Sequence, residues 1–271
     1  MLLPLVIDPV QLFEKLNHPD LILIDLSSEE NYRLGHIPGA ININPNRLLS
    51  GSPPIPNKLP SLLQLKQLLA EAGISESSHV VVYDDQLGPW AGRFIWSMHC
   101  VGLYQASFLN GQLAAWNIAG YPTEQQANLS IPVVELPLVL NAHLIADKDA
   151  IVDQLNSEQI SIWDARSAPE FSGEKVINAI KGGHIPGAHW LEWTDTLVSQ
   201  DPPRLASSHQ LQQMIKAAGI EMEKTVITHC QTHRRSGLTY IAALHAGIKD
   251  IRCYDGSWFE WGNLTDTPVE R

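Results

Sequence analysis

The sequence is poor in cysteine, poor in basic residues and free of long apolar runs, and each shortage excludes a class of protein. Three cysteines among 271 residues are too few and too widely spaced for a disulfide framework or a zinc cluster. A formal net charge of −11 argues against nucleic acid as the main partner, because nucleic-acid binders carry basic surfaces. No apolar run approaches the length that crosses a membrane. We therefore expect a protein of the reducing cytoplasm, without a metal, another cofactor or a membrane partner.

A six-residue stretch, Gly-His-Ile-Pro-Gly-Ala, occurs twice without change, at 35–40 and at 183–188. Around each copy the same features recur in one order: a buried strand ending in an acid, an amphipathic helix ending at a glycine, a second buried strand and a late tryptophan. The recurring landmarks are Asp25 and Asp164 for the acids, His36 and His184 within the repeated stretch, and Trp116 and Trp261 for the tryptophans. The chain is therefore expected to contain two tandem α/β units.

Strands that alternate with helices predict, in each unit, a mainly parallel sheet with helices on both faces. The first unit is expected at 1–122, a linker at 123–137 and the second unit at 138–271. Strands are expected at 21–25, 80–83, 162–164 and 226–228, and helices at 62–73, 91–99 and 211–219. Asp25 and Asp164 are 139 residues apart whereas His36 and His184 are 148 apart, which places nine extra residues in the second copy within 171–182.

Cys230 stands where the strand at 226–228 gives way to a polar loop, and Ser236 is expected to cap the helix that follows. Ligands of parallel sheets bind beyond the carboxyl ends of the strands. Residues 229–236 hold two arginines, two histidines and no acid, unlike the rest of this acidic chain. Backbone N–H groups of such a loop can converge on the sulfur and lower the pKa of the thiol. Cys230 is therefore predicted to be a cysteine nucleophile.

The first unit lacks this chemistry. With the spacing of 145 residues between Trp116 and Trp261, the counterpart of Cys230 is Asp85, and Pro89 and Trp90 stand where the second unit has Arg234 and Arg235. We therefore expect one active site, in the second unit. The repeated histidines and acids occur in both units, including the one without the cysteine, so they are predicted to be structural.

The order of these features resembles the rhodanese family of sulfurtransferases, in its tandem-domain form. The matching residues are the two repeated stretches, Asp164-Ala165-Arg166, the loop from Cys230 to Arg235, and Asp255-Gly256-Ser257-Trp258. In that family the first domain is typically inactive and has an Asp where the second has the catalytic Cys. The loop is most similar to a bacterial thiosulfate:cyanide sulfurtransferase subgroup with Cys-Gln-Thr-His-His-Arg, from which it differs at Arg234.

The resemblance implies that Cys230 takes the outer sulfur of thiosulfate as a persulfide and passes it to cyanide or another thiophile, with no cofactor. Arg235 is expected to hold the sulfonate, Arg234 and His233 to add positive potential, and Thr232 and Gln231 to complete the binding loop. Since Arg235 is expected in a loop, its replacement by alanine should weaken donor use far more than folding.

Two departures bear on the donor. His233 stands where many members have glycine, and Glu170 stands where vertebrate-type enzymes have a substrate-binding arginine. Mercaptopyruvate enzymes also follow the cysteine with Gly-x-Gly, which this loop lacks. Thiosulfate is therefore favoured over 3-mercaptopyruvate as the donor.

Other functions stay open. The chain could be a persulfide carrier to a partner protein, or a 3-mercaptopyruvate sulfurtransferase. A cysteine phosphatase or arsenate reductase fits less well, because their loops need five residues between Cys and Arg, and four separate Cys230 from Arg235. His229 is expected to pack on the scaffold, and Cys100 and Cys253 to be core thiols. Trp193 and Trp258 could line the pocket or belong to the core.

Overall fold

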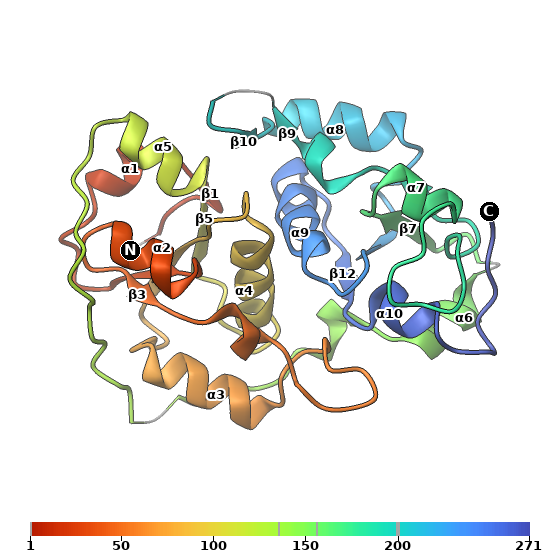
Figure 1. Cartoon of the computed structure of the whole chain (residues 1–271), viewed down its shortest axis with the longest axis horizontal. Coiled ribbons are helices and arrows are strands. Elements are labelled where there is room, and N and C mark those ends of the chain that lie inside the picture. Colours follow the sequence, from red (N-terminus) through yellow and green to blue (C-terminus); the bar gives the residue numbers. More distant parts are fainter. Residues whose placement is uncertain (1, 135, 156, 199–200) are drawn as a thin grey trace. The chain divides into compact units, whose positions relative to one another are not determined.

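The structure is a computed structural model that describes residues 2–134, 136–155, 157–198 and 201–271. By its contacts the chain divides into two compact units (Figure 1). The first contains Met1–Ser50, Leu59–Asn141 and Ser199–Arg204, and the second contains Gly51–Lys58, Ala142–Val198 and Leu205–Arg271. Each unit therefore includes a short segment from the other half of the sequence.

The first unit follows an alternation of strands and helices. Its elements are β1 (Val6–Ile7), α1 (Pro9–Phe13), β2 (Leu21–Asp25), α2 (Glu29–Leu34), β3 (Ile41–Asn42), a 3-10 turn (Pro45–Leu48), α3 (Leu62–Glu71), β4 (His79–Tyr83), α4 (Pro89–His99), β5 (Ala106–Leu109) and α5 (Gln112–Ile118).

The second unit repeats this order. Its elements are a 3-10 turn (Ala142–Leu144), β6 (Ile145–Ala146), α6 (Lys148–Gln154), β7 (Ile160–Asp164), α7 (Ala168–Ser172), β8 (His189–Trp190), a 3-10 turn (Trp193–Thr196), β9 (Leu197–Val198), β10 (Arg204–Leu205), α8 (Ser208–Ala217), β11 (Thr225–His229), α9 (Arg235–Ala246), β12 (Ile251–Tyr254) and α10 (Ser257–Trp261). Of these, β10 spans the boundary between the units.

The described residues form one five-stranded sheet in each unit, with the orders β1-β5-β4-β2-β3 and β6-β12-β11-β7-β8. The strand pairs within both sheets are parallel. The central strands β4 and β11 are buried and rich in β-branched residues, as strands covered on both faces should be. The predicted pair of parallel α/β units is confirmed, and each predicted strand lies within an observed one.

Helix boundaries follow local rules that the repeat preserves. Ser61 caps α3 and Ser207 caps α8, each in a reciprocal pair with a glutamine three residues later. The predicted start of α9 is wrong by one residue: the helix begins at Arg235, and Ser236 lies inside it rather than at the cap. Likewise α4 begins at Pro89, two residues before its predicted start, because proline suits the first helical position.

The repeated histidines have matching surroundings in the two units. Nδ1 of His36 lies 2.8 Å from the Tyr32 carbonyl oxygen, and the two rings stack with centroids 3.6 Å apart. Nδ1 of His184 lies 3.0 Å from the Phe171 carbonyl oxygen, and its ring stacks on that of Phe171 at 3.8 Å. These contacts support a structural role for both histidines.

The late tryptophans are core anchors. Trp116 and Trp261 are both fully buried, and each indole N–H donates to the carbonyl oxygen of a proline, Pro122 and Pro268 respectively.

In the part of the chain that the structure describes, no helix has the length and apolar character to span a membrane.

Candidate active site

Cys230 follows directly after β11, a strand paired with β7 on one side and β12 on the other. Its backbone is fixed by the turn after β12. The Cys230 N–H lies 3.5 Å from the Ser257 hydroxyl, and the Cys230 carbonyl accepts from the Trp258 N–H at 3.0 Å. The residue is 1% exposed. The sheet therefore holds one nearly buried sulfur at the carboxyl edge of its central strand.

Several donors surround this sulfur. The Ser236 hydroxyl donates to Sγ over 3.5 Å, and the backbone N–H groups of Ser236 and Thr232 also point toward it. Burial alone would raise the pKa of the Cys230 thiol, but the charge of Arg235 and these hydrogen bonds outweigh it and lower the pKa below its ordinary value. The site is therefore built to hold an anionic sulfur.

Arg235 does not extend its guanidinium freely toward a ligand. Nη1 and Nη2 donate to the two carboxylate oxygens of Glu170, each over 2.7 Å. Glu170 is 3% exposed, and its Oε2 also accepts from the N–H and the hydroxyl of Ser167, at 3.2 and 2.7 Å. Burial would raise the pKa of Glu170, but the hydrogen bonds from Arg235 and Ser167 and the charge of Arg235 lower it to about 2. This is a preorganised ion pair beside the cysteine.

The other predicted loop residues lie in different places. Gln231 is buried, and its side-chain amide donates to the Ile177 carbonyl oxygen, away from the sulfur. His233 has a left-handed backbone (φ 53°) and is buried, with Nδ1 2.7 Å from the Ser236 hydroxyl. Arg234 is exposed. Thus Arg235 and the Thr232 N–H act directly on the sulfur, while His233 contacts Ser236, whose hydroxyl donates to the sulfur.

Sequence reasoning missed two contributions. It treated Ser236 as a helix cap, although its hydroxyl lies against the sulfur. It noted Glu170 only as the replacement of an arginine, although that residue pairs with Arg235. A signal for Glu170 existed in Ser167-x-x-Glu170, a capping-box pattern that places the glutamate at the start of α7, immediately after β7.

His229 and the acid of β7 form a buried layer beneath the site. His229 Nε2 lies 3.6 Å from Asp164 Oδ2, and burial lowers the pKa of His229. Arg166 pairs with Asp164, and its guanidinium carbon lies 4.2 Å from the ring centroid of Trp258. As predicted, His229 packs on the scaffold. Of the two positions left open for Trp258, the structure places it in the buried core.

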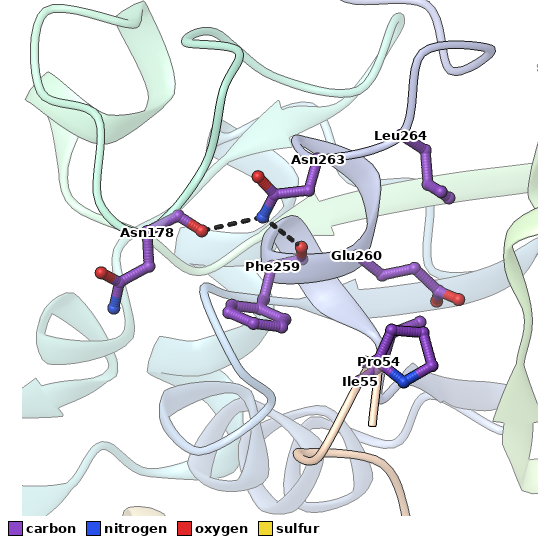
Figure 2. A pocket seen from close by; sticks show the side chains of 7 residues that line it. All are labelled: Pro54, Ile55, Asn178, Phe259, Glu260, Asn263 and Leu264. Carbon is purple, nitrogen blue, oxygen red and sulfur yellow. Dashed lines mark hydrogen bonds between the residues drawn. The ribbon is translucent and has the colours of Figure 1, made fainter. Parts of the chain in front are cut away.

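A cavity of about 450 Å³ lies against α10 in the same unit (Figure 2). The Asn263 amide crosses its edge and donates to the carbonyl oxygens of Asn178 and Phe259, each at 2.8 Å. The Phe259 N–H in turn donates to the Gln231 carbonyl oxygen over 2.9 Å. The lining residues are Pro54, Ile55, Asn178, Phe259, Glu260, Asn263 and Leu264. None of the predicted site residues is in this described lining, and the cavity meets the Cys230 loop only through the hydrogen bond from Phe259, among the described contacts.

Known proteins resemble this chain over its whole length. A sequence model of the rhodanese-like domain matches it twice, at residues 8–119 and 147–264. The chain belongs to the rhodanese family. It is 44% identical over 271 residues to a thiosulfate sulfurtransferase of Azotobacter vinelandii, covering 99% of this chain and 97% of that protein.

Some more distant relatives are 3-mercaptopyruvate sulfurtransferases. The chain is 26% identical to a 3-mercaptopyruvate sulfurtransferase of Escherichia coli, covering 96% of this chain and 95% of that protein. A solved structure of a 3-mercaptopyruvate sulfotransferase from Escherichia coli superposes with a TM-score of 0.84 at 24% identity, covering 94% of this chain and 99% of that one. That structure has the same fold.

The two rhodanese-like domains can be aligned by strand register, which corrects one sequence inference. Asp25 pairs with Tyr83 in the first sheet, and Asp164 pairs with His229 in the second. The residue after Tyr83 is Asp84, so Asp84 and not Asp85 is the counterpart of Cys230. The spacing at this strand is 146 residues, one more than at the tryptophans, because the lengths of the intervening segments differ.

Asp84 lies in a loop of the same design as the Cys230 loop. Leu87 has a φ of 72° where its counterpart His233 has 53°. The fully buried Asp84 carboxylate accepts four backbone N–H groups, from Gln86 at 2.7 Å, Gly88 at 2.8 Å, Trp90 at 2.8 Å and Ala91 at 3.0 Å. Gln86 and Trp90 correspond to Thr232 and Ser236, whose N–H groups point at the Cys230 sulfur. The first domain therefore keeps the same cradle of backbone N–H groups and fills it with its own carboxylate.

Proposed function

We propose that this protein is a thiosulfate sulfurtransferase in which Cys230 carries the transferred sulfur as a persulfide. The observation that carries the proposal is the environment of Cys230: a nearly buried thiol whose pKa is lowered by Arg235, Ser236 and the loop N–H groups. The relatives named thiosulfate sulfurtransferase support the choice of donor.

The first step is a displacement at sulfur. The Cys230 thiolate attacks the outer sulfur of thiosulfate, a new S–S bond forms, and the old S–S bond breaks with its electron pair leaving on sulfite. The persulfide formed is itself an anion at neutral pH, so the donors that stabilise the thiolate stabilise the product as well. Because these donors are already in place, no reorganisation is needed during the step.

The second step returns the thiolate. A thiophilic acceptor, cyanide or a cellular thiol, attacks the outer sulfur of the persulfide, and the electron pair of that S–S bond returns to Cys230. The thiolate needs a reducing compartment such as the cytoplasm, where the three free cysteines of this chain stay reduced. A sulfur that is 1% exposed favours small donors and acceptors over docking of a whole protein.

Two measurements test the function. After incubation with thiosulfate, intact mass should increase by one sulfur atom per chain, and cyanide should remove it with release of thiocyanate. Cys230→Ala should show neither, whereas Cys253→Ala, which changes a buried thiol on β12, should show both. An undiminished mass gain on Cys230→Ala would sink the mechanism.

The same experiment separates the alternatives. A persulfide that resists cyanide but passes to one protein thiol would identify a carrier. Sulfur uptake from 3-mercaptopyruvate in preference to thiosulfate would identify a 3-mercaptopyruvate sulfurtransferase. Cys230-dependent hydrolysis of a phosphate ester would indicate a phosphatase.

A further inference from the structure

The ion pair beside Cys230 uses both terminal nitrogens of Arg235. A guanidinium recognises a carboxylate by aligning two parallel N–H donors with its two oxygens. In this protein Glu170 already receives both terminal nitrogens of Arg235, at 2.7 Å each. The Nη1–Nη2 edge of Arg235, one of the two edges at which a guanidinium can bind a carboxylate, is therefore occupied by a residue of the protein itself.

Glu170 is held so that it does not move aside easily. It is the third residue of α7, and both the N–H and the hydroxyl of Ser167 donate to its Oε2. The side chain is 3% exposed, and that of Arg235 is 19% exposed. A ligand that displaced Glu170 would leave a buried carboxylate without its cation, which is costly.

The charge of Arg235 still reaches the sulfur. Its attraction lowers the pKa of Cys230, and the thiolate reciprocally raises the pKa of Arg235. Glu170 therefore affects one property of Arg235, its pair of Nη N–H donors, more than another, its action on the sulfur. The charge of Arg235 and a side-chain hydrogen bond to Cys230 still act on the reacting sulfur, while the Nη1–Nη2 edge is held by Glu170.

We propose that Glu170 is a positioning residue that sets the choice of donor, an inference that rests on the sulfurtransferase function proposed above. A 3-mercaptopyruvate molecule carries a planar carboxylate that is best recognised by two parallel N–H donors, and the Nη1–Nη2 edge of Arg235 is already taken by Glu170. The sulfonate of thiosulfate has three oxygens in a tetrahedral arrangement and can be bound by single donors of the loop. Glu170 therefore disfavours the carboxylate donor and leaves thiosulfate accepted.

A second carboxyl near the ion pair provides a control for the negative charge of Glu170. Glu192 is a half-buried carboxyl close enough to interact with Glu170, Arg235 and Asp195. It carries the same charge as Glu170 but, among the described contacts, makes none with the guanidinium of Arg235. Its substitution therefore changes the local charge without freeing the arginine.

The test compares Glu170→Gln with Glu192→Gln. The ratio of kcat/KM for 3-mercaptopyruvate to that for thiosulfate should rise about tenfold or more in Glu170→Gln, since a freed N–H pair recognises the donor carboxylate. It should change less than about threefold in Glu192→Gln. The Cys230 thiol pKa, measured from the pH dependence of alkylation, should fall in Glu170→Gln, because Arg235 loses its counter-charge. This pKa shift reports only the loss of a nearby negative charge, so the donor ratio, compared with that of Glu192→Gln, carries the inference.

Should Glu170→Gln fold poorly, Ser167→Ala gives a milder version, because it removes one of the groups that hold Glu170. It should move the donor ratio in the same direction by a smaller factor. An unchanged ratio in folded variants, or equal changes in the glutamate and control variants, would overturn the inference. Wild-type protein that takes no sulfur from thiosulfate would instead overturn the proposed function, so the two failures are distinguishable.

Discussion

Replacing Arg235 by alanine should damage folding as well as catalysis, and the size of the effect can be worked out from its ion pair. The pKa of Glu170 is about 2, against an ordinary value of 4.5. A difference of roughly 2.5 units corresponds to about 3 kcal/mol of stability above the ordinary pKa. Ser167 contributes part of this, so we expect Arg235→Ala to cost about 2 kcal/mol at pH 7. This revises the expectation for a loop arginine, because Arg235 lies in α9 and pairs with a buried carboxylate.

The pH dependence of the loss has a definite sign. A depressed carboxyl pKa stabilises the folded state above the unfolded pKa, and this stability disappears as the pH falls through the folded value. The deficit of Arg235→Ala should therefore be full at pH 7, shrink below about pH 4.5 and nearly close by pH 2. Adding Glu170→Gln to Arg235→Ala should recover most of the loss at pH 7, because no buried charge is then left unpaired.

Urea unfolding followed by circular dichroism at pH 7, 5 and 3 measures these differences, and hydrogen exchange of peptides from β11 and α9 assigns them to the second unit. Equal stability of wild type and Arg235→Ala at pH 7 would refute the reasoning. So would a double variant less stable than Arg235→Ala alone, since that would mean Glu170 is not left unpaired in the single variant.

Two further predictions concern the groups that surround Asp84 in the first domain and Cys230 in the second. In a Cys230→Ala background, Asp84→Cys should gain one sulfur atom from thiosulfate in an intact-mass measurement, more slowly than the native site because no arginine matches Arg235. Asp85→Cys in the same background should gain none, and the reverse result would restore the 145-residue alignment. Ser236→Ala should raise the Cys230 thiol pKa by about one unit, since a hydrogen bond to a charged sulfur is lost. Alkylation rates from pH 5 to 10 measure this, and an unchanged pKa would leave stabilisation to the backbone and Arg235.

Much of the fold could be predicted from the sequence because the chain contains two copies of the same α/β unit. Each strand and helix has a counterpart, so a weak pattern in one copy is supported by the other. Helix starts were less predictable. Pro89 and Arg235 begin their helices one or two residues before the predicted starts, because a helix end depends on capping geometry as much as on periodicity.

The candidate site was predictable in part. Cys230 stands out because its loop collects basic residues in an acidic chain. The direction of a side chain within a loop has no period, so the sequence could not separate Arg235, which reaches the sulfur electrostatically, from exposed Arg234. Nor could it reveal that Glu170, 65 positions earlier in the chain, occupies the arginine. Such pairs depend on how β7 and β11 lie side by side.

The alignment of the two copies failed by one residue for a related reason. A single spacing carried from the tryptophans to the cysteine ignores a difference of one residue between the helical segments. Only the register of paired strands fixes which residues are equivalent, and it selects Asp84. The error mattered little for the prediction of a single active site in the second unit, because both candidates are aspartates.

The exchange of segments between the two units has a consequence for how the protein is made. The Asn57 side-chain amide donates to the Asp255 carbonyl oxygen at 2.6 Å within the second unit, and Arg204 pairs with Asp8 at 3.0 Å within the first. During synthesis, the first unit thus waits for residues near 204 before it is complete, by which time much of the second has emerged. A gene fragment beginning at 142 would likewise lack Asn57 and Lys58. Each half of the coding sequence therefore lacks contacts that the other half supplies, and both units are complete only when the whole chain is present.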